Sequence, residues 1–530
     1  MFMRPKIEAE PGVTRFPSPL RRALDVVAIV TLGLVAFFSR RGSLPWDGLW
    51  FDDSWVAAGA IHGSMTNLMT VEPAHPSFTG LLMAVNRLGS GELHDLGVPS
   101  LAAGVAGVVL LYIALRSVGY GFSIAGLLSA AFAVAPIHIL YSGRVKGYTF
   151  DTLWVLVLAL VVPRLAARTW RWPLAVGWVA GAITIGAFSG YSLIATAAAA
   201  IMLVLHPMGD RAVRIAALLS QAAIQMLYFA VARSKVDVAE LNEMLARKFD
   251  AHMAFSWSPV DLAHEVWRHL HRVAEVFPGG SGEWLALSVV LAICGLVVSA
   301  IKPRSRSESL VARFLLLLIV IAFFGSFFGQ LPFGPSNAIV VSPGGRHMLW
   351  LVPSIAFGLG AVVHRARQRI ASVAALRFSF DALAVAAAAT IVIVGYRPAL
   401  PALFPGSESA TKFIEASMRD GDVVIVTNTS TFAHAASSSK EVDLVATPSH
   451  QIGFAPVFLD PRMYVLGEWA AQRGSDEGIR SRARHAERVF VHITEPPRLE
   501  HGPADRALGS LGFSKKTYQF EWNRVEVWQR

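Results

Sequence analysis

Long apolar stretches separated by short polar segments dominate the first 400 residues of the chain. A helix needs about 20 mainly apolar residues to cross a bilayer. The stretches that meet or approach that length are 23–38, 99–115, 121–140, 149–163, 172–189, 190–206, 213–231, 284–301, 312–329, 347–363 and 379–396. The boundary between the fifth and the sixth is placed at Gly190. The pattern predicts a mainly α-helical polytopic membrane protein with about eleven spans.

The distribution of positive charge orients these spans, because Lys and Arg collect on the cytoplasmic side of membrane proteins. With the N-terminus in the cytoplasm, every inside loop is basic. The short outside loops 141–148 and 330–346 then carry only Arg144, Lys146 and Arg346. We therefore expect an integral protein of the cell (plasma) membrane with a cytoplasmic N-terminus and an extracytoplasmic C-terminal domain.

The first apolar stretch has two interpretations. A basic segment before a short apolar run is typical of a signal peptide as well as of an anchor. The residues that follow the run, Phe37–Arg41, offer no small-x-small cleavage site. We therefore expect this stretch to remain in the protein as a membrane anchor.

Composition excludes several classes of protein. The chain has 530 residues, of which 54% are hydrophobic and 16% charged, and its mean hydropathy is +0.49. About 25% charged residues is usual for a soluble domain, so a soluble enzyme and a disordered protein are excluded. The single cysteine, Cys294, allows no intrachain disulfide. The net charge of +10 arises from basic residues in the cytoplasmic loops. We therefore expect no nucleic-acid partner.

The spans divide the chain into three parts. Residues 1–22 form a cytoplasmic tail, and residues 23–400 form a transmembrane domain. Two long loops of that domain, 39–98 and 232–283, lie outside the cytoplasm, as does a soluble domain over 405–530.

The C-terminal domain alternates helix-like and strand-like segments. Ser409–Arg419 predicts a helix, Val423–Thr427 and Arg488–Ile493 predict strands, and Lys516–Trp528 predicts a terminal hairpin. These segments predict a small α/β domain. It has no glycine-rich phosphate loop, so no chemistry is assigned to it.

Two adjacent carboxylates open the first outside loop. Asp52 and Asp53 follow Trp46 and Trp50, and residues 53–62 predict a short helix whose acidic start suits the helix dipole. Beside a membrane, one carboxylate could act as a general base while the other orients it or binds a metal. The alternative is that either aspartate caps the helix.

Further along the same loop, His75 precedes a second amphipathic stretch, Ser77–Leu88, which we expect at the membrane surface. His75 could contact a lipid phosphate, or form a metal site with Glu72 and His62. No spacing here matches a zinc motif. A solvated loop histidine is the alternative.

Cations at the outer ends of spans are the remaining candidates. Arg144, Lys146 and Tyr148 lie in a short outside loop, where a lipid phosphate would explain positive charge. Arg346 follows two glycines at the start of another span, where backbone N–H groups could add to an anion site. The alternative for these side chains is anchoring at lipid headgroups, which requires no function.

These segments together resemble the GT-C class of membrane glycosyltransferases. The similarity is greatest to the branch that holds the protein O-mannosyltransferases and the bacterial lipid A aminoarabinose transferase. An acidic pair in the first outside loop is the hallmark of that class, and Asp52-Asp53 matches it. The chain departs from the pattern at His75, where a lysine is common, and at Ser77, where a second proline is common. The further matching segments are Trp55–Gly63, His75–Ser77, Val98–Leu101, Ala135–Tyr148 and Arg346–Pro353.

The resemblance implies an inverting transfer of a sugar from a polyprenyl-phosphate donor to an acceptor hydroxyl outside the cytoplasm. Asp52 takes the position of the general base, and Asp53 orients the base or the acceptor. Arg144, Lys146, Tyr148, Arg346 and His75 are the expected donor-phosphate ligands. No cofactor is implied, and a divalent metal is a minor alternative. The acceptor could be a protein, a lipid or a polysaccharide.

Two other functions remain open at this stage. A flippase or transporter of lipid-linked sugars would place polar residues at membrane depth, and Asp25 and Asp151 could be read in that way. It would also favour an inverted repeat, which the chain does not show. A noncatalytic envelope scaffold would leave the acidic pair unexplained. Sugar transfer by purified protein distinguishes these functions.

Overall fold

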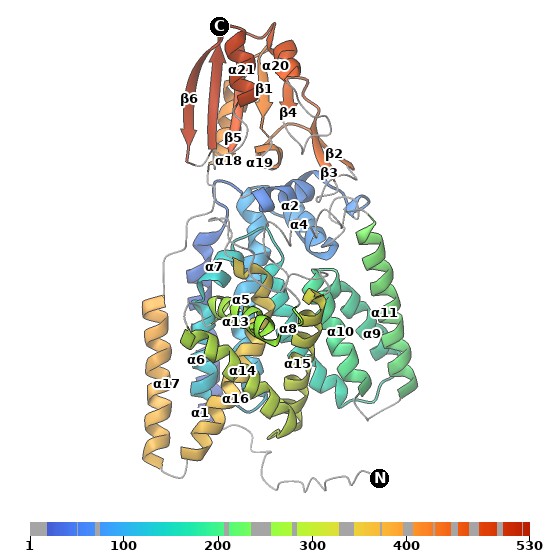
Figure 1. The fold of residues 1–530 in the computed structure, drawn as a ribbon, viewed down its shortest axis with the longest axis vertical. Helices are drawn as coiled ribbons and strands as arrows, with labels where there is room; N and C mark the ends of the chain where they lie inside the picture. Colours follow the sequence, from blue (N-terminus) through green and yellow to red (C-terminus); the bar gives the residue numbers. More distant parts are fainter. Residues whose placement is uncertain are drawn as a thin grey trace.

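A computed structural model gives the fold. It describes residues 19–49, 51–68, 75–205, 211–234, 256–277, 283–327, 344–370, 374–395, 406–427, 430–446, 454–465, 476–494, 502–521 and 523–530. A helical body and a smaller sheet-containing domain lie one above the other along the long axis (Figure 1).

Within the described residues, eight helices are long and apolar enough to cross a membrane. They are α1 (Pro19–Arg40), α5 (Leu93–Ser117), α8 (Tyr148–Ala166), α11 (Arg211–Arg233), α14 (Glu283–Ile301), α15 (Arg306–Phe327), α16 (Val352–Ile370) and α17 (Ala374–Gly395). Two shorter apolar helices, α9 (Trp172–Gly186) and α10 (Gly190–Leu205), meet at the boundary expected at Gly190. The protein is therefore an integral membrane protein.

The stretch expected as one span over 121–140 is broken. It forms α6 (Phe122–Ala133) and α7 (Pro136–Ser142), which are bent by 60°. Pro136 has no N–H to continue the helix. Arg40, which is fully buried, donates instead to the carbonyls of Phe132 at 3.2 Å and Ala133 at 2.6 Å. The arginine at the end of α1 therefore stabilises a break that hydropathy alone does not reveal.

Two short helices, α2 (Phe51–His62) and α4 (Pro76–Leu88), lie between the helical body and the C-terminal domain (Figure 1). Both were expected from the sequence. The second long loop contributes α13 (Pro259–Val276), which the Ser258 side chain caps by accepting from the N–H of Asp261. A 3₁₀ helix, η2 (Gly344–Leu351), leads into α16.

The C-terminal domain is an α/β domain, as predicted. Its five-stranded sheet has the order β4-β1-β5-β7-β6, in which β1 pairs with β4 and β5 in parallel and β7 pairs with β5 and β6 antiparallel. A separate antiparallel pair is formed by β2 and β3. The strands are β1 (Val423–Val426), β2 (Val442–Ala446), β3 (Phe454–Phe458), β4 (Met463–Val465), β5 (Arg488–Thr494), β6 (Ser514–Phe520) and β7 (Asn523–Gln529).

In the part of this domain that the structure describes, the helices are α18 (Ser407–Ser417), α19 (Thr431–Ser437), α20 (Asp476–Ala483) and α21 (Gly502–Ser510). One buried apolar cluster packs against each side of the sheet. Ile425 and Val491 belong to one cluster, and Val424 and Phe490 belong to the other. Neighbouring residues of one strand point to opposite faces of the sheet. The continuous apolar runs of β1 and β5 therefore make both faces apolar, and each face is covered by a buried cluster.

Candidate active site

The acidic pair lies in the first turn of α2. The helix begins at Phe51, so neither aspartate is the N-cap residue, and the capping interpretation does not describe them. Their negative charge is still favourable near the positive end of the helix dipole. Asp52 is partly exposed, whereas Asp53 is buried at 3% exposure.

Arg144 pairs with Asp53. The Nη1 of Arg144 donates to Oδ2 of Asp53 at 3.0 Å, and the two side chains are only 6% and 4% exposed. Arg144 and Lys146 are both buried, so the interpretation of them as headgroup anchors is wrong. A carboxylate 91 residues away in the chain neutralises Arg144.

Lys146 completes the charged cluster. Its Nζ lies 4.1 Å from the ring centroid of Trp55, which is two residues after Asp53 on α2. A buried cation over an indole face is a favourable electrostatic contact. The backbone carbonyl of Lys146 accepts from Ser100 Oγ at 2.9 Å, which joins this loop to α5.

Burial and charge act in opposite directions on Asp53. Burial raises its pKa, and the charges of Arg144 and Lys146 offset part of that rise. Its Oδ1 is buried and has no hydrogen-bond partner among the described residues. The cluster therefore holds one oxygen of the carboxylate firmly and leaves the other within a closed environment.

Tyr148 connects this cluster to η2. Its ring packs edge-on against Tyr141 at 5.1 Å and against His347 at 5.9 Å between centroids. Thr152, one turn further along α8, donates to the carbonyl of Leu349 at 2.8 Å. These contacts bring the backbone next to Arg346 to the same end of α8 as Arg144, as the donor-phosphate hypothesis requires. The side chain of Arg346 lies outside the described residues.

His75 is the N-cap residue of α4, although its side chain makes no capping hydrogen bond. It is partly buried and close enough to Asp151 for an electrostatic interaction. Asp151 itself accepts hydrogen bonds from Ser189 and from Ser192 Oγ, the latter at 2.9 Å. His75 is thus half-buried at the start of α4, and its role towards a phosphate stays a prediction.

The metal alternative involves His62, Glu72 and His75. Nε2 of His62 hydrogen-bonds the carbonyl of Ala435 at 2.8 Å, while Glu72 lies outside the described residues. Across the described ranges, no three His, Cys, Asp or Glu side chains are grouped as metal ligands.

The C-terminal domain packs against α2. Phe432, Ala435 and Ala436 of α19 share a buried cluster with Val56 and Ala57 of α2. Two further bonds join the domains: Leu49 N–H donates to Ser407 Oγ at 3.2 Å, and Gly406 N–H donates to the Asp47 carbonyl at 2.5 Å. The sequence assigned no role to this domain, and the contact shows that it positions the helix that carries the acidic pair.

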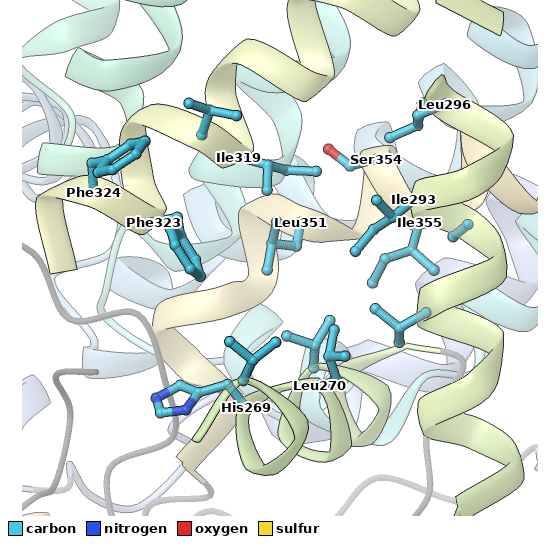
Figure 2. A pocket seen from close by; sticks show the side chains of 15 residues that line it. His269, Leu270, Ile293, Leu296, Ile319, Phe323, Phe324, Leu351, Ser354 and Ile355 are labelled. Atoms are coloured by element: carbon cyan, nitrogen blue, oxygen red, sulfur yellow. The ribbon is translucent and has the colours of Figure 1, made fainter. Parts of the chain in front are cut away.

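The helical body also contains an apolar cavity of about 350 Å³. It is lined by α13, α14, α15 and the junction of η2 with α16 (Figure 2). Figure 2 shows Leu351, Ile355 and Phe323 around it, with Ser354 and His269 as its polar side chains. Such a cavity suits a hydrocarbon chain.

Comparison with known proteins supports the fold. No family model matches the chain, and no curated protein matches it. Two solved structures of ArnT from Cupriavidus metallidurans do match. The first, bound to undecaprenyl phosphate, has 13% identity and a TM-score of 0.53 over 95% of this chain and 97% of that chain. The second, in the apo state, has 12% identity and a TM-score of 0.54 over 96% and 98%. The chain therefore has the GT-C fold of these ArnT structures, with membrane helices and a C-terminal sheet domain, as the resemblance implied.

Proposed function

We propose that the protein is a glycosyltransferase. It moves a sugar from a polyprenyl-phosphate donor to an acceptor hydroxyl at the membrane face that carries α2 and the C-terminal domain. The observation that carries this proposal is the buried cluster of Asp53, Arg144 and Lys146 beside Asp52 at the start of α2. The shared fold with an ArnT structure that holds undecaprenyl phosphate supports the class of donor.

Asp52 is the general base in this proposal. The acceptor oxygen attacks the anomeric carbon, and its proton passes to the carboxylate of Asp52. The bond from the anomeric carbon to the phosphate oxygen breaks, so the polyprenyl phosphate leaves as an anion without being protonated. A single displacement of this kind inverts the anomeric centre. Asp52 suits the role because it is the partly exposed member of the pair.

Asp53 has a positioning role. Its ion pair with Arg144 fixes the first turn of α2 against the loop that precedes α8. In the transfer reaction this holds the neighbouring Asp52 at a constant place relative to the donor. Preorganised groups contribute to catalysis because they need no rearrangement during the reaction.

The charge balance of the cluster supports a phosphate site that includes Arg346. Asp52 and Asp53 offset Arg144 and Lys146, so these four side chains carry about zero net charge near neutral pH. A phosphate anion then requires a further cation. Arg346 would supply it from η2, with Tyr148 donating a hydrogen bond from its hydroxyl and His75 at the rim. Burial of Lys146 at 9% exposure strengthens its attraction for an anion that reaches it.

The apolar cavity next to η2 would receive the first part of the isoprenoid chain. Its lining by Leu351, Ile355 and Phe323 matches a hydrocarbon, and Leu351 belongs to η2, whose His347 contacts Tyr148. A donor would then extend along η2, with its phosphate near Tyr148 and its chain in the cavity.

The two acidic residues that suggested a flippase have structural partners within the protein. Asp25 pairs with Arg116 at 2.9 Å, and Asp151 accepts from two serines, so both acids have local structural partners. The scaffold alternative still leaves the buried ion pair at the start of α2 unexplained. The chemistry of the site does not distinguish between a protein, a lipid and a polysaccharide acceptor.

The test is sugar transfer by purified protein in detergent. Undecaprenyl-phosphate-linked mannose, arabinose and aminoarabinose would be offered with lipid, peptide and polysaccharide acceptors, and released undecaprenyl phosphate would be measured. The proposal requires product with at least one pair. Movement of the intact donor across vesicles without cleavage would establish a flippase instead, and neither activity would favour a scaffold.

A further inference from the structure

A second polar cavity lies at the opposite end of the helical body. It has a volume of about 1170 Å³ and is lined by the first turns of α1, the end of α16, residues 378–389 of α17, the segment just before α15, and the connection between α5 and α6. In Figure 1, α1, α16 and α17 extend to the end farthest from the C-terminal domain. This cavity is therefore separate from the candidate active site.

The charged side chains that line the cavity are mostly basic. Arg21, Arg116, Arg304 and Arg367 line it, against two carboxylates, Asp25 and Asp381. Arg116 and Arg367 each bond one of these carboxylates, at 2.9 Å through Nε in both cases. Arg304 pairs with a third carboxylate, that of Glu308, at 3.0 Å. Four arginines against three carboxylates leave a formal charge of +1.

Two buried polar atoms at this cavity have no hydrogen-bond partner among the described residues. They are Nη2 of Arg304 and Nδ1 of His364. His364 is 7% exposed, and its ring lies 5.6 Å from that of Tyr120. Nε of Arg304 does bond Glu308, at 3.0 Å, which fixes the direction of the guanidinium. Buried polar groups without partners are costly, so an acceptor from outside the chain would satisfy the Arg304 guanidinium, and also His364 in the tautomer that carries its proton on Nδ1.

Another part of the cavity lining is apolar. Phe378, Ala382, Val385, Ala386 and Ala389 of α17 line it. Their spacing of three or four residues places them on one face of that helix. Phe378 is 76% exposed and Val385 is 48% exposed. The cavity thus combines a cationic head region with an apolar strip along a membrane-spanning helix.

We propose that this cavity binds an anionic lipid through its phosphate headgroup, with Arg304 and His364 at the phosphate and α17 along the hydrocarbon chain. Charge complementarity selects a phosphate, and the apolar strip selects a molecule with a chain over a free anion. Basic pockets between membrane helices bind such headgroups. The sequence assigns this face to the cytoplasm, where anionic lipids are abundant.

The experiment measures lipid binding to the purified full-length protein by native mass spectrometry. The probes are dioleoylphosphatidylglycerol, dioleoylphosphatidylcholine and inorganic phosphate. The wild type is expected to retain phosphatidylglycerol in preference to phosphatidylcholine. Arg304→Gln should weaken that binding about 10-fold or more, through the loss of one charge-assisted hydrogen bond. The protein should still fold, because Arg365 also pairs with Glu308, at 3.3 Å.

Val385→Trp tests the apolar lining independently, because the larger indole ring would occupy the space beside α17 that the hydrocarbon chain needs. It should weaken phosphatidylglycerol binding and leave inorganic phosphate unaffected. Two matched controls lie outside the cavity: Arg164→Gln near the end of α8, and Val394→Trp, a 73% exposed residue on α17. Both should bind lipid within about 2-fold of wild type.

Three results would overturn the proposal. The first is equal retention of the two lipids by the wild type. The second is an equal loss of binding in a variant and its matched control. The third is tight binding of inorganic phosphate that displaces phosphatidylglycerol, which would make the cavity an anion site without a lipid chain.

Discussion

The ion pair between Asp53 and Arg144 allows a quantitative prediction. The two charges are 3.0 Å apart and their side chains are at most 6% exposed. At an effective dielectric constant of about 20, Coulomb's law gives an attraction of roughly 5 kcal/mol, most of which offsets the desolvation of the two groups. Removing one partner leaves the other charge buried and uncompensated, which costs about 3–5 kcal/mol.

A double-mutant cycle tests this reasoning. Asp53→Asn and Arg144→Met should each lower the thermal stability of the protein strongly. The double variant should be more stable than the sum of the two losses predicts, with a coupling of at least about 2 kcal/mol, because it contains no unpaired charge. The measurement is thermal unfolding of the four proteins in detergent, followed by tryptophan fluorescence.

The control is a solvent-exposed ion pair. Glu477 is 74% exposed and pairs with Arg480 at 3.4 Å, so Glu477→Gln should cost less than about 1 kcal/mol. Additive losses in the cycle, or an Asp53→Asn protein as stable as wild type, would show that the pair does not organise the start of α2.

Two further predictions concern stability. Burial lowers the pKa of His492 to about 4, and its Nδ1 lies 2.9 Å from Nδ1 of His434. Between about pH 6.5 and pH 4 the unfolded chain therefore binds a proton that the folded domain does not. The free energy of unfolding should be constant above about pH 6.5 and fall by about 3 kcal/mol towards pH 4. His492→Gln should reduce this fall, as measured by unfolding curves at pH 7.5 and pH 5. Gly295 allows α14 to approach α16, because an added Cβ would lie 2.1 Å from the carbonyl oxygen of Gly358. Gly295→Ala should lower the melting temperature, whereas Gly177→Ala, whose Cβ meets nothing within 4 Å, should not.

The membrane helices follow from the sequence because their signal is local. Each apolar run is long enough to specify a helix by itself, and the predicted break at Gly190 separates α9 from α10. The strands β1 and β5 and the terminal hairpin were predicted for the same reason. The bend between α6 and α7 was not, since the carbonyls of Phe132 and Ala133 that it exposes are bonded by Arg40, which is distant in the sequence.

The candidate site was predicted only as a set of residue types. The acidic pair and the basic loop were both identified, but nothing local in the sequence indicates that Arg144 pairs with Asp53. The same holds for the contact of His62 with Ala435, which joins the C-terminal domain to α2. Pairings between distant segments are set by the fold, and periodicity carries no information about them.

The most direct test of the central claim is sugar transfer by the Asp52→Asn protein. Asparagine keeps the size of the side chain and most of its hydrogen bonding but cannot accept the acceptor's proton. Folding and donor binding would be measured on the same samples, with Asp53→Asn alongside. If Asp52 is the base, this variant binds donor while transfer falls by a factor on the order of 10²–10⁴, and Asp53→Asn loses less transfer. Near-normal transfer by a folded Asp52→Asn protein would contradict the assignment of the base and of the active site at α2.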